Sequence, residues 1–372
     1  MSTTSGPAGT HDLAGTSGPA ATSALAEAPG PAEPPGLAEI SEAVTVRAHD
    51  LTAWVAGTEI RADSLRALRE RLGDHLYRTL HQGAGEATPH PRDLSDDAFV
   101  AGLKRAVPHS ACRVPARLAP AAAENGGDET TVVLQGVRVT VPRALVRTAP
   151  PVQAGETGGA GETGGAGDGG DVTVELPEGG DVTVELPPCR PALSPGFLAV
   201  LGTRQPRGHA PPVLRVYLHI ARPEAASTVW GTALRRLEEL GVPYQAKVLA
   251  HPDRYPRKDA MVVYLGGRTG TALEALADVA AGPAGEGLAP AVSPFARRIG
   301  PGVAIAWEPH PDPGAVRRLS FGQHRARAYA DGLVEHSLHG TPLARSVGRA
   351  LHAAGADPGR PYRNSDSPSV AP

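Results

Sequence analysis

The chain has 372 residues, with 45 glycines, 38 prolines and a formal net charge of −3 at pH 7. This near-balance of charge gives no global electrostatic case for binding nucleic acid or an anionic membrane. No apolar run approaches the roughly 18 residues that a membrane-spanning helix needs, and no basic and apolar signal segment opens the sequence. We therefore expect a cytoplasmic protein.

Cysteine and lysine are both rare. Cys112 and Cys189 are the only cysteines and do not form a close pair, which fits a reducing compartment and excludes a cysteine zinc site or a disulfide scaffold. The lysines are Lys104, Lys247 and Lys258, and every other basic residue is arginine. A lysine inside an apolar strand therefore calls for an explanation.

Segments of biased composition divide the chain. Residues 1–43 and residues 356–372 lack an apolar period and are predicted to be disordered. Residues 150–188 contain short motifs repeated in tandem, which indicates an expanded surface loop. Two folded regions remain, residues 44–149 and residues 189–355.

The first folded region is predicted to be mainly helical with some β-structure. Residues 130–141 alternate as a strand does. Apolar residues at helical spacing predict a helix through Ile60, Leu65, Leu68, Leu72 and Leu76.

The second folded region predicts an α+β fold, with a mixed or antiparallel sheet and flanking helices. Strands are predicted at residues 213–220, 244–250, 260–265 and 303–307. Helices are predicted at residues 223–240, 271–281 and 320–338, and a last helix begins at Thr341.

The strand at 213–220 carries the first candidate site residues. Arg215, Tyr217 and His219 alternate with apolar residues, so they project together from one side of the sheet. A solvated strand face is the competing interpretation, but serine, threonine or glutamate would serve that purpose equally well.

Lys247 lies in the middle of the apolar strand at 244–250, where it must reach water or occupy a polar pocket. A desolvated ammonium group beside guanidinium groups loses proton affinity, and such a lysine can act as a general base near neutral pH. Arg257 follows in a cationic loop, for which simple solvation is the alternative.

Ser320 and Gln323 form a capping box that opens the helix at 320–338. A helix N-terminus favours an anion, and a phosphate there would offset the unfavourable position of Arg325. His324 beside it could give a proton to a departing oxygen. An ordinary capped surface helix is the alternative.

Metal and cofactor motifs are absent from the sequence. His336 and His339 are three residues apart on a predicted helix, but no carboxylate accompanies them, so a solvated helix face is the better interpretation. A lysine base, a histidine acid and several arginines without a metal suit β-elimination of phosphate from phosphoserine or phosphothreonine. Hydrolysis would need a nucleophile or a metal-activated water.

Six short motifs in one order carry a family resemblance. They are Ser194-Pro195-Gly196-Phe197, Arg215-Val216-Tyr217-Leu218, Ala246-Lys247-Val248-Leu249, Arg257-Lys258-Asp259-Ala260 with Tyr264, Pro301-Gly302-Val303, and Ser320-Phe321-Gly322-Gln323-His324-Arg325. Together they resemble the HopA type III effector family, and within it the stand-alone lyases of class V lanthipeptide and thioamitide biosynthesis. The resemblance covers residues 191–338 well and the first folded region only loosely.

The resemblance implies a lyase that acts after a separate Ser/Thr kinase has phosphorylated a precursor peptide, with a cyclase acting later and no cofactor required. Lys247 would be the base, and His324 or His219 the acid. His219 departs from the family pattern, which often has asparagine there, so the choice stays open. The implied sets are catalytic Lys247, His324, His219 and Tyr217, and phosphate-binding Arg215, Arg257, Arg325, Ser320 and Gly322.

Two other functions remain open at this point. The chain could be a non-catalytic module that binds leader peptide or phosphopeptide and supports a kinase, because an effector need not be an enzyme. It could also be an effector that acts on a host protein.

Overall fold

The computed structural model describes residues 36–83, 94–119, 128–134, 136–148, 180–190, 193–205, 212–266, 269–311 and 318–369. Within these ranges the chain forms seven α-helices and three antiparallel sheets of three, five and seven strands. The predicted α+β class is confirmed.

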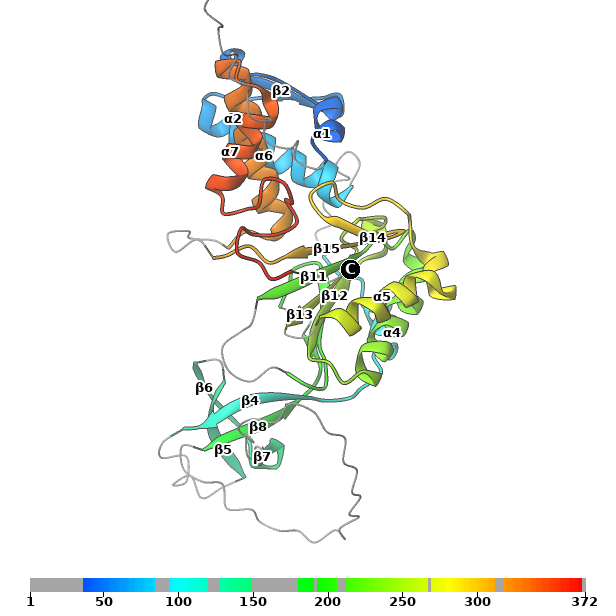
Figure 1. The fold of residues 1–372 in the computed structure, drawn as a ribbon. Helices are drawn as coiled ribbons and strands as arrows, with labels where there is room; N and C mark the ends of the chain where they lie inside the picture. Colours follow the sequence, from blue (N-terminus) through cyan, green and yellow to red (C-terminus); the bar gives the residue numbers. More distant parts are fainter. Residues whose placement is uncertain are drawn as a thin grey trace, which may run out of the picture.

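The seven-stranded sheet lies at the centre of the second folded region (Figure 1). The strands predicted at 213–220, 244–250, 260–265 and 303–307 are all present in it. Its order is β14 (Arg297–Gly300), β15 (Val303–Trp307), β11 (Val213–Leu218), β13 (Met261–Gly266), β12 (Tyr244–Leu249), β10 (Phe197–Leu201) and β9 (Cys189–Arg190).

One face of this sheet packs against helices. β11 turns Leu214, Val216 and Leu218 to this face, where they join a continuous apolar core. The predicted helices at 223–240 and 271–281 are confirmed, and Figure 1 shows them along this face. The covering helices are α3 (Asp97–Arg105), α4 (Pro223–Glu239) and α5 (Gly270–Ala281).

The opposite face of β11 is also covered. Tyr217 shares a second apolar core with Val262 and Phe321, so the polar strand face is buried and the solvated interpretation is wrong. The covering layer comes from both ends of the chain and includes the two helices predicted at 320–338 and from Thr341. Its elements are α1 (Leu37–Ala43), β1 (Val44–Arg47), β2 (Thr52–Val55), β3 (Thr58–Arg61), α2 (Leu65–Leu76), α6 (Phe321–His339) and α7 (Leu343–Ala353).

The start of the chain corrects two predictions. Residues 37–43, expected to be disordered, form α1, in which Leu37 and Ile40 are buried at 2% and 0% exposure. Residues 1–35 lie outside the described residues. Ile60 belongs to β3, because Ser64 caps α2 by accepting a hydrogen bond from the Ala67 amide and the helix begins only after it.

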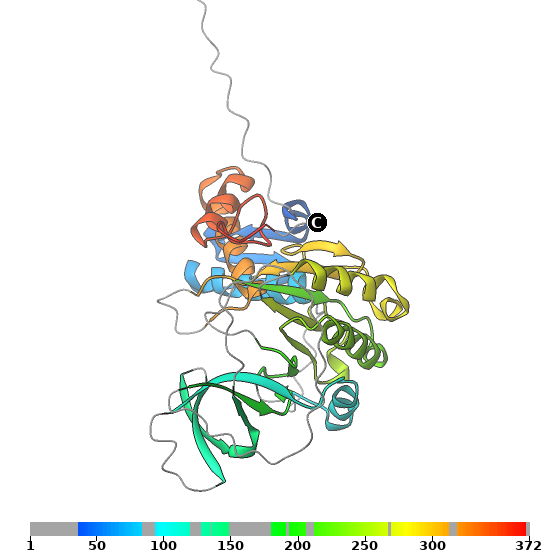
Figure 2. The same cartoon turned by 60° about the horizontal axis from the view of Figure 1, so that its bottom comes forward.

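The five-stranded sheet forms a separate lobe with its own apolar core (Figure 2). The single strand predicted at 130–141 is wrong, because Gly136, with φ of 84°, turns the chain into a hairpin. The sheet order is β6 (Val137–Pro142), β5 (Glu129–Leu134), β4 (Cys112–Leu118), β8 (Asp181–Leu186) and β7 (Val146–Thr148).

β8 corrects the surface-loop prediction for residues 150–188. This second copy of the tandem repeat pairs with β4 and β7, and it buries Val182 and Val184 at 1% and 0% exposure. The first copy lies outside the described residues. The alternation of polar and apolar residues in this copy indicates a strand, whereas its tandem repetition indicates a loop, and the structure follows the alternation.

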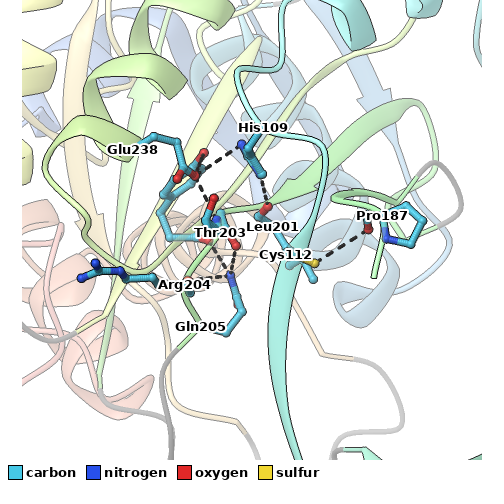
Figure 3. A network of polar contacts seen from close by, with 10 residues as sticks. His109, Cys112, Pro187, Leu201, Thr203, Arg204, Gln205 and Glu238 are labelled. Carbon is cyan, nitrogen blue, oxygen red and sulfur yellow. Dashed lines mark hydrogen bonds and ion pairs between the residues drawn. The ribbon is translucent and has the colours of Figure 1, made fainter. Parts of the chain in front are cut away.

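Polar contacts join the five-stranded sheet to the seven-stranded one (Figure 3). His109, just before β4, lies 2.8 Å from the Leu201 carbonyl at the end of β10 and 3.4 Å from a Glu238 oxygen on α4. Glu238 also accepts hydrogen bonds from the Thr203 amide and the Tyr244 hydroxyl, each at 2.9 Å. Burial alone would raise the pKa of Glu238, but these donors lower it.

The C-terminal segment is folded where it is described. Residues 356–369, expected to be disordered, return to the seven-stranded sheet, and Asn364 is 3% exposed. The Trp307 amide donates to the Tyr362 carbonyl at 2.7 Å, and the Asn364 side chain donates to the Glu308 carbonyl at 2.8 Å. Residues 370–372 lie outside the described part.

Among the helices of the described ranges, none combines the length and the apolar character needed to cross a membrane.

Candidate functional site

The candidate site lies on the face of the seven-stranded sheet that carries Tyr217, opposite the face covered by α4 and α5. Antiparallel register places Tyr217 of β11 opposite Val262 of β13, and Val262 opposite Lys247 of β12. In the next row Arg215 is opposite Tyr264. Residues opposite one another on a pleated sheet share a face, so Lys247, Arg215 and Tyr217 project toward the same layer.

Lys247 is half-buried between two aromatic rings. Its Nζ lies 4.3 Å from the centroid of the Phe197 ring and 5.9 Å from that of Tyr264. With Ser194 and Tyr264 it lines a cavity of about 220 Å³. Within the described residues Lys247 forms no ion pair, so its amine is available to a ligand in that cavity.

Arg257 also contacts the Phe197 ring. Its guanidinium carbon lies 5.5 Å from the ring centroid, and its Nε and Nη2 each donate to one Asp259 oxygen at 2.7 Å. Burial would raise the pKa of Asp259, but the charge and hydrogen bonds of Arg257 lower it, with help from the Lys247 charge. Asp259 is therefore a carboxylate that holds Arg257 in place and leaves Nη1 of Arg257 outside the pair.

Arg215 is buried and paired with Glu308, a residue that the sequence analysis did not single out. Its guanidinium also lies 5.1 Å from the Tyr264 ring centroid. The adjacent Tyr217 hydroxyl is buried without a well-formed hydrogen bond to any described residue. Burial raises the pKa of Tyr217, although the Arg215 charge opposes this, so Tyr217 is a neutral phenol at neutral pH.

The structure therefore brings only some of the predicted site residues together. Lys247 shares the Phe197 ring with Arg257 and the Tyr264 ring with Arg215. Arg325 does not join them. It is 0% exposed and donates to the Pro361 carbonyl at 2.6 Å and to the Asn364 side chain at 2.9 Å.

Arg325 was predicted to bind phosphate, and the structure gives it a different role. Its guanidinium also donates to the Arg363 carbonyl at 3.1 Å and to Nδ1 of His324 at 2.7 Å. Burial lowers the pKa of Arg325 to about 10, so it remains charged at neutral pH. It binds the C-terminal segment to α6.

The two candidate acids are both neutral histidines at neutral pH. Burial, followed by the charge of Arg325, lowers the pKa of His324 to about 4. Burial also lowers the pKa of His219, whose Nδ1 lies 2.8 Å from the Ala291 carbonyl and donates to it. Neither imidazole is a ready proton donor in the free protein.

The start of α6 is capped as predicted but does not present an open anion site. The Ser320 hydroxyl accepts from the Gln323 amide, and the Gln323 side chain accepts from the Ser320 amide at 3.0 Å. Gly322 is buried beneath His81, and a methyl group added at Gly322 would overlap that imidazole ring. The phosphate-binding roles predicted for Ser320 and Gly322 are not supported by this arrangement.

His81 and Tyr77 come from the first folded region, on a π-helical turn (Tyr77–Gln82) that continues α2. The two rings stack at 5.6 Å, and His81 meets Tyr217 edge-on at 5.3 Å. Nδ1 of His81 lies 2.8 Å from the Ser293 hydroxyl. Sequence reasoning missed both residues because they lie more than a hundred positions before the motifs, and no spacing rule connects them.

His336 and His339, considered for a metal, lie on α6 away from this face. His336 Nδ1 is 2.6 Å from the Thr341 carbonyl. A carboxylate does accompany the pair, contrary to the sequence analysis, because His339 pairs with Glu335 at 3.3 Å. No group of three or more potential metal ligands gathers in the described ranges.

Comparison with known proteins gives a family-model match over part of the chain and several matching solved structures, among them two effector proteins. Residues 189–363 match the sequence model of the HopA1 effector protein family, and no curated protein matches the chain. The effector protein from Pseudomonas syringae pv. syringae strain 61 is 18% identical with a TM-score of 0.35, and that from Pseudomonas syringae pv. tomato strain DC3000 is 19% identical with a TM-score of 0.32. Each alignment covers 45% of this chain and 62% of the effector.

Proposed function

Because residues 189–363 belong to the HopA1 effector protein family, we propose that they form the lyase region of an enzyme of peptide maturation. It eliminates phosphate from phosphoserine or phosphothreonine of a ribosomal precursor peptide and leaves dehydroalanine or dehydrobutyrine. A separate Ser/Thr kinase supplies the substrate in the cytoplasm, and a cyclase consumes the product. The reaction needs no metal or cofactor, and its partners include no nucleic acid or membrane.

The observation that carries this proposal is the position of the Lys247 amine. It lies at a cavity, without a carboxylate partner among the described residues, and shares aromatic rings with Arg215 and Arg257. Such an arrangement suits a substrate that brings both an anion and an acidic C–H bond.

The elimination is written with Lys247 as the base. Its Nζ takes the Cα proton, and the electron pair of the broken C–H bond forms the Cα=Cβ double bond. The Cβ–O bond breaks, and its electron pair leaves with the phosphate, which takes up a proton. The guanidinium charge of Arg257 offsets the charge that develops on the departing group.

Nη1 of Arg257 takes no part in the pair with Asp259, so it is the part of that side chain that we assign to phosphate, although Tyr77 also hydrogen-bonds this guanidinium. Arg215 contacts the Tyr264 ring and is paired with Glu308, so it supports that ring without binding phosphate directly. His219 directly follows β11 and, within the described residues, its ring bonds only the Ala291 carbonyl, through Nδ1, whereas the His324 ring is bonded to the buried Arg325. His219 is therefore our candidate for returning a proton to the phosphate, and it would first have to gain a proton on Nε2.

The alternative is a binding module that holds a phosphopeptide without reacting. The family is one of effector proteins, and an effector acts on a target without needing to be a lyase. The same cations would then serve affinity alone.

A synthetic phosphoserine peptide separates these possibilities. Incubation with the full chain and a metal chelator, followed by mass spectrometry, is expected to show loss of phosphoric acid. Recovery of the unmodified serine peptide would indicate a phosphatase, and an unchanged phosphopeptide would indicate binding alone.

Lys247→Ala is expected to reduce turnover about 10²- to 10⁴-fold, the range for removal of a general base, while phosphopeptide affinity changes much less. Lys104→Ala is the matched control, because Lys104 is exposed on α3. Equal loss of affinity and product in Lys247→Ala, or full activity in it, would remove Lys247 from the role of base.

A further inference from the structure

Arg254 is a further cation close to Arg257, and the sequence analysis did not single it out as a site residue. Its guanidinium lies against Gly196, which has φ of 77°, and a methyl group at that position would overlap Nη1. Gly196 directly precedes Phe197, whose ring contacts both Lys247 and Arg257. The missing side chain at Gly196 therefore leaves the space that the Arg254 guanidinium occupies, one residue away from the Phe197 position and close enough to Arg257 to feel its charge.

Arg254 has no anionic partner in the described part of the chain. Asp259 is the nearby carboxylate, and Arg257 already occupies both of its oxygens at 2.7 Å. Arg254 is half-buried, and burial together with the Arg257 charge lowers its pKa. A partly desolvated charge beside a like charge is unfavourable until an anion arrives.

Arg215 and Arg325 differ from it in this respect. Glu308 neutralises Arg215, and three groups of the C-terminal segment hold Arg325. A phosphate group would have to displace protein partners from either of them, whereas Arg254 is free to bind it with a fork of N–H donors.

We propose that Arg254 is a phosphate-binding residue of this site, and that it forms, with Arg257, the seat for the phosphate monoester of a phosphorylated peptide, next to Lys247 as the base. This inference rests on the proposed function for the identity of the substrate. It replaces Arg325 with Arg254 as the additional guanidinium of the seat.

The proposal predicts opposite effects on stability and on binding. Arg254→Gln removes an unpaired charge, so the melting temperature of the free protein is expected to rise or stay unchanged. Ligands that bind only the folded state raise the melting temperature, and in Arg254→Gln the rise produced by phosphate is expected to vanish. A residue that only supports the fold would show the reverse, a lower melting temperature with the phosphate effect intact.

The experiment measures thermal unfolding of the full chain with and without inorganic phosphate, and affinity for a phosphothreonine peptide and its unphosphorylated counterpart. Arg254→Gln is expected to weaken the phosphopeptide about 10- to 100-fold, the effect of losing a charge-assisted hydrogen bond. Arg254→Lys should retain part of the affinity, because it keeps the charge without the fork. Arg105→Gln, at an exposed position of α3, is the matched control and should change neither quantity.

Phosphopeptide affinity that survives Arg254→Gln unchanged overturns the inference, as does a stabilising effect of phosphate that survives it. These binding measurements do not depend on turnover. If the wild type binds phosphopeptide through Arg254 but releases no phosphate from it, the lyase proposal fails and the assignment of Arg254 stands. If elimination proceeds normally in Arg254→Gln, only the assignment fails.

Discussion

Four arginines near the site show that residue type alone does not define a role. A buried guanidinium is costly unless charges or carbonyls surround it. Glu308 partners Arg215, Asp259 partners Arg257, and backbone carbonyls partner Arg325. Of these four, only Arg254 has neither an ion pair nor a side-chain hydrogen bond among the described residues, and it is the one that we assign to ligand binding.

His81 gives a residue-scale prediction for pH. Burial lowers its pKa to about 4, despite the opposing charge of Asp259. The unfolded chain binds a proton at His81 below its ordinary pKa of 6.5, whereas the folded protein excludes that proton until about pH 4. The contribution of His81 to the free energy of unfolding is therefore fully present above pH 6.5. It decreases by about 3 kcal/mol as the pH drops toward 4, which destabilises the folded protein.

Urea unfolding at a series of pH values measures this dependence. His81→Gln is expected to flatten the loss of stability between about pH 6.5 and pH 4, whatever its stability at neutral pH. His352→Gln, at an exposed position of α7, should leave the slope unchanged. An unaltered slope in His81→Gln would mean that His81 does not carry this proton linkage.

At the scale of elements, the sequence predicts where α6 begins but not what the start of this helix binds. The capping box is local, so the sequence predicts it well. What covers the helix end is not local, and the structure places His81 against Gly322 there. Because an imidazole ring already covers this helix N-terminus, we interpret it as part of the packing of the fold and not as an anion-binding site.

Ser320→Ala tests that interpretation. Loss of the N-cap is expected to lower the free energy of unfolding by about 1 kcal/mol, with phosphopeptide affinity unchanged. Ser64→Ala at the start of α2 is the matched control, since the Ser64 hydroxyl caps in the same way. A large drop in affinity confined to Ser320→Ala would restore Ser320 to the phosphate site.

At the scale of the whole molecule, the C-terminal segment supports the site through contacts with Arg325 and Glu308. It satisfies the fully buried Arg325 and binds the Glu308 carbonyl, while the Glu308 side chain pairs with Arg215. Composition suggested disorder there because the segment is rich in polar residues and proline. Its order comes from polar contacts with α6 and β15, which a composition rule does not detect.

Removal of residues 356–372 is expected to destabilise the protein by about 3–5 kcal/mol, because a buried charge loses its partners. Urea unfolding measures the loss. Removal of residues 370–372 alone serves as the control and should leave the midpoint in place. An unchanged midpoint in the longer deletion would show that Arg325 does not depend on this segment.

The sequence alone determined the parts of this protein that depend on neighbours along the chain. The alternation at 213–220, the helix at 223–240 and the capping box at Ser320 follow from side-chain period and local hydrogen bonds, and the structure confirms them. Lys247 stood out because a charge within an apolar strand has a local cost.

Tertiary structure alone decided which charges meet. Tyr77, His81 and Glu308 reach the site from distant segments, and Arg325 leaves it for the C-terminal segment. The energy of a desolvated charge depends on the groups that lie within a few ångströms of it. Tertiary packing decides which groups these are, whatever their separation along the chain.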